Sequence, residues 1–248
     1  MILAVDIGNT NINMGSFREN KLVSHSCING ESLMQQRTLF SLDSSLLNEI
    51  QYIVIASVNP GIESAFYKYL DNEYTKKVLK IMRDIQLSMP VLVDKPEKVG
   101  VDRLVNALAA FKRTETSTIV IDFGTAITFD IVSKGGEFLG GLIMPGLETS
   151  AFALNKRTAY LPKVDIKKPD KIIGKDTNSA ILSGIYNGTV GAVLYILKEI
   201  QRELGSVQSI VTTGGDARKF IEDLPQDNMY IPHLTLEGIK IAFEESID

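Results

Sequence analysis

The feature that most constrains the fold is a short motif that occurs twice, almost half of the 248-residue chain apart. The apolar run 2–5 ends in Asp6-Ile7-Gly8-Asn9-Thr10, and the apolar run 119–121 ends in Asp122-Phe123-Gly124-Thr125. Each copy reads as a buried strand that delivers an aspartate, one further residue and a glycine into a turn. A repeat of this length predicts two similar structural units rather than one continuous core.

The segments after the two turns support the same division. Strands are predicted at 12–17 and 22–27 in the first half and at 128–132 and 138–143 in the second, with hairpin turns at Asn20 and Gly135-Gly136. Helices and strands then alternate in both halves, which predicts an α/β architecture of two lobes, residues 1–115 and 116–248. The further predicted strands are 51–57, 78–82 and 209–213, and the predicted helices are 63–70, 104–111, 177–204, 217–224 and 236–245.

Composition narrows the functional classes. Lys and Arg number 26 against 30 Asp and Glu, a net charge of -4, so the chain has no basic footprint for nucleic acid. Cys27 is the only cysteine, which excludes an internal disulfide, and its apolar strand predicts a buried thiol. The N-terminus runs into a strand without a secretory signal, so we expect a cytoplasmic protein. Of the two histidines, we expect His25 on a strand surface and His233 in a turn.

The stretch 180–197 has no charged residue and is long enough to raise the question of a membrane span. Gly184 and Gly188 have the spacing of a helix-pairing motif. However, polar residues such as Ser183 and Asn187 interrupt the run, and no Lys/Arg cluster sets an orientation. We therefore expect no membrane span but the interface of a homodimer, because an exposed apolar patch of this length is unusual for a monomer.

Both Asp-x-Gly turns have the chemistry of a phosphate site. The glycine permits a turn and a close approach that a Cβ would block. The amides and hydroxyls that follow can point at phosphate oxygens, and the aspartate can hold a metal ion directly or through water. One copy would equally be an ordinary turn, but two equivalent copies predict a cleft between lobes that grips a nucleotide. The chain has neither a Walker sequence nor a G-x-G-x-x-G fingerprint.

Two further clusters lie at predicted helix starts. Thr213-Gly214-Gly215-Asp216 is the candidate contact for the adenosine end of the nucleotide, although the same glycines would also suit a plain strand-to-helix turn. Gly100-Val101-Asp102-Arg103 places a carboxylate beside a guanidinium. Asp102 could take a proton from a substrate hydroxyl while Arg103 orients a polar group. The alternative is that Asp102 only stabilises a helix N-terminus.

With these motifs in this order, the chain resembles type III pantothenate kinases, a family of the actin-like ATPase, sugar-kinase and Hsp70 superfamily. The Gly-x-Asp-Arg element between two phosphate turns discriminates, since the other motifs occur across the superfamily. The resemblance implies duplicated actin-like (ribonuclease H-like) lobes. It also implies ATP-dependent phosphorylation of pantothenate, the first step of coenzyme A biosynthesis. The matching segments are 6–10, 100–103, 122–128, 140–146, 174–177 and 213–215.

The resemblance also implies roles for individual residues. Thr125 would touch ATP, Asp6 would help to hold Mg²⁺, and Asp122 would bind a monovalent cation such as K⁺ or NH₄⁺. Thr177 would contact pantothenate across the interface of a homodimer. The residues that would hold pantothenate are Gly100, Val101, Asp102 and Arg103, with Asp102 as general base. The residues that would wrap the ATP phosphates are Asp6, Ile7, Gly8, Asn9, Thr10, Asn11, Ile12 and Asn13.

One departure from the family pattern concerns the substrate. The family usually has a Tyr shortly before the Gly-x-Asp-Arg element, in a Tyr-Asp-Asn-Pro-like run, where this chain reads Val93-Asp94-Lys95-Pro96. The pantothenate contact implied for that Tyr is therefore lost here or supplied elsewhere. Other functions compatible with the motifs are a different actin-like small-molecule kinase, a phosphoester hydrolase, a non-catalytic nucleotide-binding regulator and an actin-like filament subunit.

Overall fold

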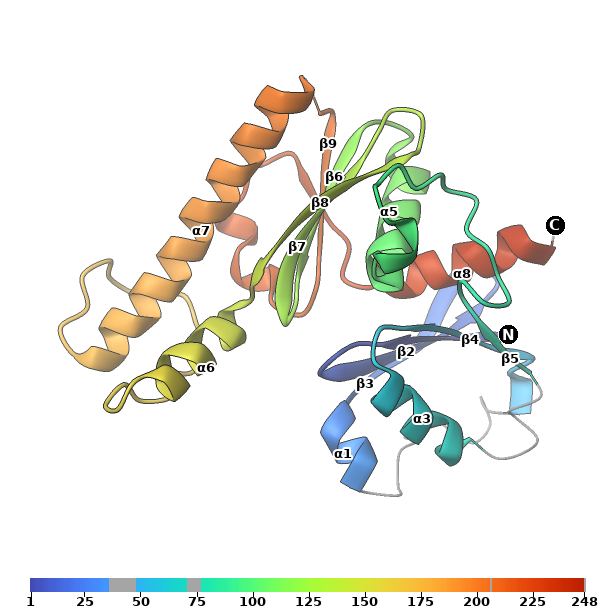
Figure 1. The fold of residues 1–248 in the computed structure, drawn as a ribbon, viewed down its shortest axis with the longest axis horizontal. Coiled ribbons are helices and arrows are strands. Elements are labelled where there is room, and N and C mark those ends of the chain that lie inside the picture. Colours follow the sequence, from blue (N-terminus) through green and yellow to red (C-terminus); the bar gives the residue numbers. More distant parts are fainter. Residues whose placement is uncertain (36–47, 71–76, 206, 248) are drawn as a thin grey trace. The chain divides into compact units, whose positions relative to one another are not determined.

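The computed structural model describes residues 1–35, 48–70, 77–205 and 207–247 (Figure 1). The chain forms two compact units. Unit 1 comprises Met1–Glu115, Gly136–Leu139 and His233–Asp248, and unit 2 comprises Thr116–Gly135 and Gly140–Pro232. The predicted lobes divide the chain once, after residue 115. In the structure, two short segments of the second half, Gly136–Leu139 and His233–Asp248, belong to unit 1. The lobe boundaries themselves stay a prediction of the sequence.

Unit 1 is built on a five-stranded mixed sheet with the strand order β3-β2-β1-β4-β5. β1 runs antiparallel to β2 and parallel to β4, and β2 and β3 form an antiparallel hairpin. Parallel pairing of β4 with β5 completes the sheet. The strands are β1 Ile2–Ile7, β2 Asn11–Arg18, β3 Lys21–Asn29, β4 Tyr52–Ser57 and β5 Val78–Lys80.

The second sheet repeats this topology, with the order β10-β9-β6-β7-β8. β6 occupies the place of β1, since it runs antiparallel to β7 and parallel to β9. β9 pairs with β10 in parallel, as β4 does with β5. The duplication expected from the two Asp-x-Gly motifs is therefore confirmed. The strands are β6 Thr118–Phe123, β7 Ala126–Val132, β8 Phe138–Pro145, β9 Ser209–Thr213 and β10 Asn228–Tyr230.

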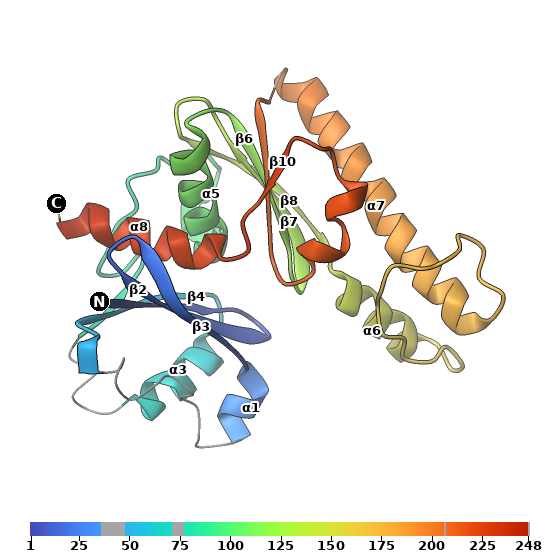
Figure 2. The ribbon, with the colours of Figure 1, turned by 180° about the vertical axis from the view of Figure 1, so that it is seen from behind.

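Helices cover both faces of the unit 1 sheet, as both views show (Figures 1 and 2). The face that carries Leu3, Val5 and Ile7 packs on α1 (Gly30–Gln35) and α3 (Pro60–Tyr69) in one apolar cluster. The opposite face carries Asp6 and meets α8 (Leu234–Ile247), which packs on α5 (Val101–Thr114). The polar turn residues that follow β1 therefore emerge from a strand that is covered on both sides.

Local signals in the sequence explain where the helices begin. Asn59 caps α3 by accepting the backbone N–H groups of Gly61 and Ile62, and Pro60 occupies the first turn. Asp176 and Ser179 form a capping box at the start of α7 (Thr177–Leu204). The predicted bounds of this long helix agree with the structure, and Gly205 follows it at a φ of +80°.

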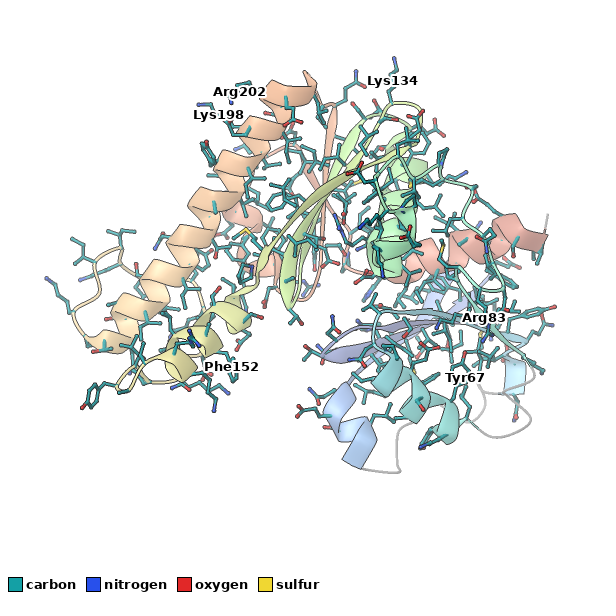
Figure 3. All side chains as sticks on the ribbon, in the orientation of Figure 1. Tyr67, Arg83, Lys134, Phe152, Lys198 and Arg202 are labelled. Carbon is teal, nitrogen blue, oxygen red and sulfur yellow. The ribbon has the colours of Figure 1, made fainter. Side chains whose placement is uncertain are left out.

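α7 is the one helix of the described residues that is long and apolar enough to cross a membrane by length and composition, and 33% of its apolar window is buried. One face packs on α6 (Leu147–Arg157) and the unit 2 core. Lys198 and Arg202 project from its last turns (Figure 3). The other face is exposed and includes Gly184, Gly188 and Tyr195.

Two expectations for the fold were wrong. Residues 217–224 form two short 3₁₀ helices, η2 Ala217–Lys219 and η3 Ile221–Asp223, instead of one α-helix. Phe220 between them is buried and stacks on Phe123 and Tyr186, so tertiary packing overrides helix propensity there. Cys27 is exposed, because β3 is an edge strand whose alternate residues face solvent. The elements that were not predicted are α1, α6, β10 and the 3₁₀ helix η1 Pro96–Lys98.

Candidate active site

The first Asp-x-Gly turn lies at the end of β1 in unit 1. Gly8 donates its backbone N–H to the carbonyl of Asn11 over 2.9 Å, which closes the turn into β2. A Cβ at Gly8 would lie 3.2 Å from that carbonyl, so a larger residue would crowd the turn. Asp6 faces Asn13 across the two strands, and Asn13 Nδ2 donates to Asp6 Oδ2 over 3.1 Å. The Asp6 carboxylate is therefore held in place beside an exposed turn.

Exposure divides the residues assigned to the ATP phosphates. Ile7 and Ile12 are fully buried in the core of unit 1, so only their backbone groups can meet a ligand. The remaining residues reach the surface at least in part. The exposed residues are Asn9, Thr10 and Asn11, and the partly buried ones are Asp6, Gly8 and Asn13.

The Gly-x-Asp-Arg element begins α5 in the same unit. Gly100 precedes the helix, and the Asp102 side chain folds back against it, since a Cβ at Gly100 would lie 2.5 Å from Asp102 Oδ1. The glycine thus makes room for the carboxylate. The same Cβ would lie 3.6 Å from Val58, and the backbone N–H of Val58 donates to the carbonyl of Ile7 over 3.0 Å. Through Val58, the element lies next to the end of β1.

Burial governs the charge of Asp102. Withdrawal of the carboxylate from water raises its pKa above the usual range, and this effect exceeds the opposing effects of the Arg103 backbone N–H and charge. That N–H donates to Asp102 Oδ1 over 2.8 Å. A carboxylate with a raised pKa accepts a proton more readily than an exposed aspartate does. The position therefore has the electrostatics of a general base.

Arg103 is oriented by an aromatic ring that the sequence analysis missed. Its guanidinium lies over Phe138, which is fully buried. Phe138 exchanges backbone hydrogen bonds of 2.8 Å with Pro90 and Leu92, so the first residues of β8 attach to the segment before η1. No local pattern in the sequence signals this contact, because the two residues meet only through the tertiary fold.

The second Asp-x-Gly turn lies at the end of β6 in unit 2, and the turn at Gly214 packs directly on it. Gly214 has a φ of +97°, a conformation that favours glycine. A Cβ there would collide with Asp122 Oδ1 and with the Phe123 carbonyl. Asp216 donates its backbone N–H to the same carbonyl over 3.0 Å. The structure thus brings Asp122 together with Gly214 and the exposed Gly215.

A third segment of unit 2 joins the same turn. Gly146 donates its backbone N–H to the Thr125 carbonyl over 3.0 Å, and Thr149 Oγ1 donates to that carbonyl over 2.6 Å. A Cβ at Gly146 would collide with the carbonyls of Gly124 and Thr125. The Thr125 side chain itself is exposed. In the sequence, Gly146 stands out only as part of a segment that matches the family, and Thr149 is a lone threonine that gives no signal.

Thr177 is the exposed first residue of α7. The cap beneath it is well formed, since Asp176 Oδ1 accepts the Ser179 backbone N–H over 3.0 Å. A surface hollow of about 820 Å³ runs along this part of α7. Its lining includes Thr177 together with Gly184 and Gly188. Thr177 therefore lies beside the exposed small-residue face of the helix.

Each of the two turns offers one carboxylate to a metal ion, Asp6 in unit 1 and Asp122 in unit 2. In the described part of the chain, no three His, Cys, Asp or Glu side chains are grouped closely enough to hold one alone. Mg²⁺ in kinases is commonly bound through one or two carboxylates and the substrate phosphates, so Asp6 fits an ion that arrives with ATP. Asp122, with the turn carbonyls around it, offers the oxygen donors that suit a hard cation.

Comparison with known proteins shows to which family a chain with these turns belongs. Residues 2–199 match the family described as type III pantothenate kinase. The chain belongs to this family. Type III pantothenate kinases from Dehalococcoides mccartyi and Koribacter versatilis are 36% and 37% identical to it, over 98% and 99% of this chain and 97% and 96% of their own.

Solved structures confirm the actin-like ATPase fold. A Campylobacter jejuni structure named for the Baf family of transcriptional activators has a TM-score of 0.64 at 21% identity, covering 98% of both chains. An activator of 2-hydroxyisocaproyl-CoA dehydratase from Clostridium difficile, with bound ADPNP, has a TM-score of 0.52 at 14% identity, covering 99% of this chain and 95% of its own. At these identities the likeness bears on the fold alone.

The match confirms the family that the motifs predicted, and with it the enzyme class and the activity. The activity is the ATP-dependent phosphorylation of pantothenate, the first step of coenzyme A biosynthesis.

Proposed function

We propose that Asp102 is the general base when this chain phosphorylates pantothenate with ATP. The observation that carries the proposal is the partly buried Asp102 carboxylate, with a raised pKa, at the start of α5. In-line transfer needs the acceptor hydroxyl aligned with the γ-phosphoryl group and a proton acceptor within hydrogen-bond reach. As the hydroxyl oxygen of pantothenate bonds to phosphorus, its proton passes to Asp102 and ADP leaves.

Pantothenate is held, in this proposal, by the rest of the Gly-x-Asp-Arg element. Pantothenate carries a carboxylate, and a guanidinium held over a ring, as in Arg103, suits its recognition. Gly100 supports this assignment because its missing Cβ leaves room at the Asp102 carboxylate. Val101 is buried and would contribute its backbone. Where the family usually has Tyr, the partly buried Val93 has no polar group to offer.

ATP is held, in this proposal, by both Asp-x-Gly turns. In unit 1 the exposed turn 9–11 offers amide and hydroxyl groups to the phosphates, beside the fixed Asp6 carboxylate. In unit 2 the exposed Thr125 would contact ATP, and Gly214 and Gly215 would let the adenosine part lie against the backbone.

Two cations complete the proposal. Asp6 would hold Mg²⁺, directly or through water, and Asp122 would hold a monovalent cation such as K⁺ or NH₄⁺. When bound with ATP, these ions neutralise phosphate charge during transfer. The support is a single carboxylate at each turn, which Asn13 orients at Asp6 and which lies beside Gly214 at Asp122.

The active form, we propose, is a homodimer that pairs along α7. The exposed face of this helix carries Ala180, Gly184, Gly188 and Gly191, and a Cβ at any of the three glycines would meet nothing within 4 Å. Phe152, Ile172, Ile173 and Tyr195 are further exposed apolar side chains of unit 2. A second copy packed there would cover this surface and bring Thr177 to the pantothenate of its partner. The family consists of soluble metabolic enzymes, and we expect this member in the cytoplasm, with no membrane or nucleic acid as partner.

A coupled assay tests the proposal. The protein is incubated with ATP, Mg²⁺ and K⁺, with pantothenate or a panel of sugars, and ADP is followed. We expect ADP release that depends on pantothenate and is lost in Asp102→Asn. Release without an acceptor would indicate a hydrolase, release with a sugar would indicate another kinase, and no release with intact ATP binding would indicate a regulator. Each of these three results would refute the proposal.

A further inference from the structure

Three residues form a row across the unit 1 sheet at the ATP turn. Asp6 of β1 faces Asn13 of β2, and Asn13 faces Cys27 of β3. Residues directly opposite in a sheet share a face and have Cβ atoms about 4.5–5.5 Å apart. The three side chains therefore lie on one face, with Asn13 between the carboxylate and the thiol.

Within this row, Asn13 forms a hydrogen bond with Asp6. Asn13 Nδ2 donates to Asp6 Oδ2 over 3.1 Å, which is a good hydrogen bond to a charged acceptor. An asparagine amide carries two N–H donors and one carbonyl acceptor. Since one donor is committed to Asp6, the amide plane and the carboxylate orient each other.

The surroundings hold Asn13 firmly in this position. β2 pairs with β1 on one side and with β3 on the other, so Asn13 cannot move without disrupting two strand pairings. Asn13 is partly buried, whereas Asn11, its neighbour on the same face of β2, is exposed. Side chains that reach a phosphate directly are expected among the exposed turn residues rather than inside the sheet.

We propose that Asn13 is a positioning residue, which orients the Asp6 carboxylate for Mg²⁺–ATP rather than contacting the phosphates itself. The inference rests on the proposed role of Asp6. It changes the role assigned to Asn13 from a direct phosphate contact to an indirect one. A direct contact would still act without the Asp6 carboxylate, whereas an indirect one would not. A residue that acts only through Asp6 becomes irrelevant once the Asp6 carboxylate is removed.

A double-mutant cycle on nucleotide binding makes this distinction. Affinity for Mg²⁺–ATP is measured from the ligand-dependent shift in thermal unfolding, which remains measurable for weak binding at millimolar nucleotide and needs no pantothenate. Asn13→Leu removes the donor, and Asn13→Asp keeps the shape but places an oxygen against Asp6 Oδ2. Each change is made in the wild-type chain and in Asp6→Asn.

We expect both Asn13 variants to weaken Mg²⁺–ATP binding by about 10- to 100-fold in the wild-type chain, the usual effect of a hydrogen bond to a charged group. In the Asp6→Asn background, Asn13→Leu should alter affinity by less than about twofold, since the partner carboxylate is gone. Asn13→Asp should cost clearly less there than in the wild-type chain, since no second carboxylate faces it. Equal losses in both backgrounds would assign Asn13 to the phosphates and overturn the inference. Unchanged affinity in the wild-type background would overturn it as well.

Controls separate this result from misfolding and from the proposed function. Asn29→Ser changes an asparagine of β3 on the same face, whose side chain caps α1 instead, and should leave nucleotide affinity unchanged. Thermal unfolding without ligand reports whether each variant folds, and Asn13→Asp covers the case in which Asn13→Leu does not. If the cycle shows coupling but pantothenate is not phosphorylated, the proposed function fails while the positioning role stands.

Discussion

The guanidinium carbon of Arg103 lies 5.6 Å from the centroid of the buried Phe138 ring. A cation in this position is attracted by the face of the ring, with a contribution of about 0.5–2 kcal/mol. If Arg103 binds pantothenate as proposed, Phe138 acts on the substrate through it, although the ring lies on a strand more than 30 residues further along the chain. Its ring also fixes the direction in which the guanidinium can bind a carboxylate.

Phe138→Leu should raise the KM for pantothenate by about 2- to 30-fold, because it removes the cation–π contact but keeps an apolar side chain. The value of kcat should change less, since the Asp102 carboxylate is untouched. Steady-state kinetics measure both. Phe129→Leu, which changes another fully buried phenylalanine, is the control for loss of core packing. If Phe138→Leu still raises KM in an Arg103→Leu background, the ring does not act through Arg103.

The raised pKa of Asp102 predicts opposite effects on stability and on activity. Because burial raises the folded-state pKa, the protonated carboxyl favours the folded state, and this stability is lost as the pH rises through the folded-state pKa. Asp102→Asn should therefore be more stable than the wild type near pH 8, and the difference should shrink as the pH falls towards the unfolded-state pKa of about 3.9. Denaturant unfolding at both pH values checks this.

For activity, the same shift moves the acid limb of the pH profile upward. The base must be ionised, so kcat/KM of the wild type should fall as the pH falls through the raised pKa of Asp102. Asp102→Asn should lose about 10²- to 10⁴-fold in kcat and retain ATP binding. Near-normal turnover in this variant would remove Asp102 from catalysis, and loss of ATP binding would reassign it to the nucleotide.

The strands of both sheets other than β10, and the long helix, were predictable because their signals are local. The repeated Asp-x-Gly motif and the apolar runs before it specify β1 and β6, and the uncharged run after Asp176 specifies α7. The contacts around Phe220 and Phe138 were not predictable, because each ring meets partners that are distant in sequence. Segment 217–224 was mistaken for an α-helix for this reason.

The candidate site shows the same limit. Asp6, Asp122 and Asp102 were identified from residue types and family motifs, and their roles stay proposals. The hydrogen bond between Asn13 and Asp6 and the contact of Gly146 with the Thr125 turn appear only in three dimensions. Exposure was also hard to predict at the edge of a sheet. Cys27 reads as a core residue in an apolar stretch, yet it lies on the solvent-facing side of an edge strand.

Replacing each turn aspartate should separate the two cations. Asp6→Asn should raise the Mg²⁺ concentration needed for half-maximal activity, because a neutral amide is a weaker ligand than a carboxylate. Asp122→Asn should instead remove the stimulation by K⁺ or NH₄⁺. Activity titrated with each ion in both variants measures this. If both variants keep the wild-type response to both ions, neither carboxylate holds a cation.

Gly188→Leu should break the proposed dimer without damaging the fold of the chain. A Cβ at Gly188 would meet nothing within 4 Å, and Leu has a higher helix propensity than Gly by up to about 1 kcal/mol. In a closely packed dimer, the added side chain would push the two helices apart. Sedimentation velocity measures the state of assembly. Gln201→Leu, at an exposed position of the same helix outside the uncharged stretch, is the control. A monomeric wild type would refute the dimer and, with it, the proposed role of Thr177.

Cys27 should report the charge of Asp6. Although the residue is exposed, partial withdrawal of its thiol from water raises the pKa of Cys27 most, and the Asp6 carboxylate raises it further because a nearby negative charge disfavours the thiolate. Asp6→Asn should therefore lower the pKa of Cys27, although burial still keeps this pKa above its usual value. With more thiolate present, the thiol should react faster with an aromatic disulfide at pH 8. The assay reads one site, since Cys27 is the only cysteine.

The matched control for this reporter is Glu31→Gln, which removes an exposed carboxylate of α1 that has no part in the Cys27 shift. Its thiol reaction rate should equal that of the wild type, whereas Asp6→Asn should be faster at every pH below the thiol pKa. Mg²⁺–ATP bound at the turn beside Asp6 should also change the rate in the wild type, because it adds charge to the same face of the sheet. Identical rate–pH curves for the wild type and Asp6→Asn would mean that the Asp6 charge does not reach Cys27, and the row across β1, β2 and β3 would not be electrostatically coupled.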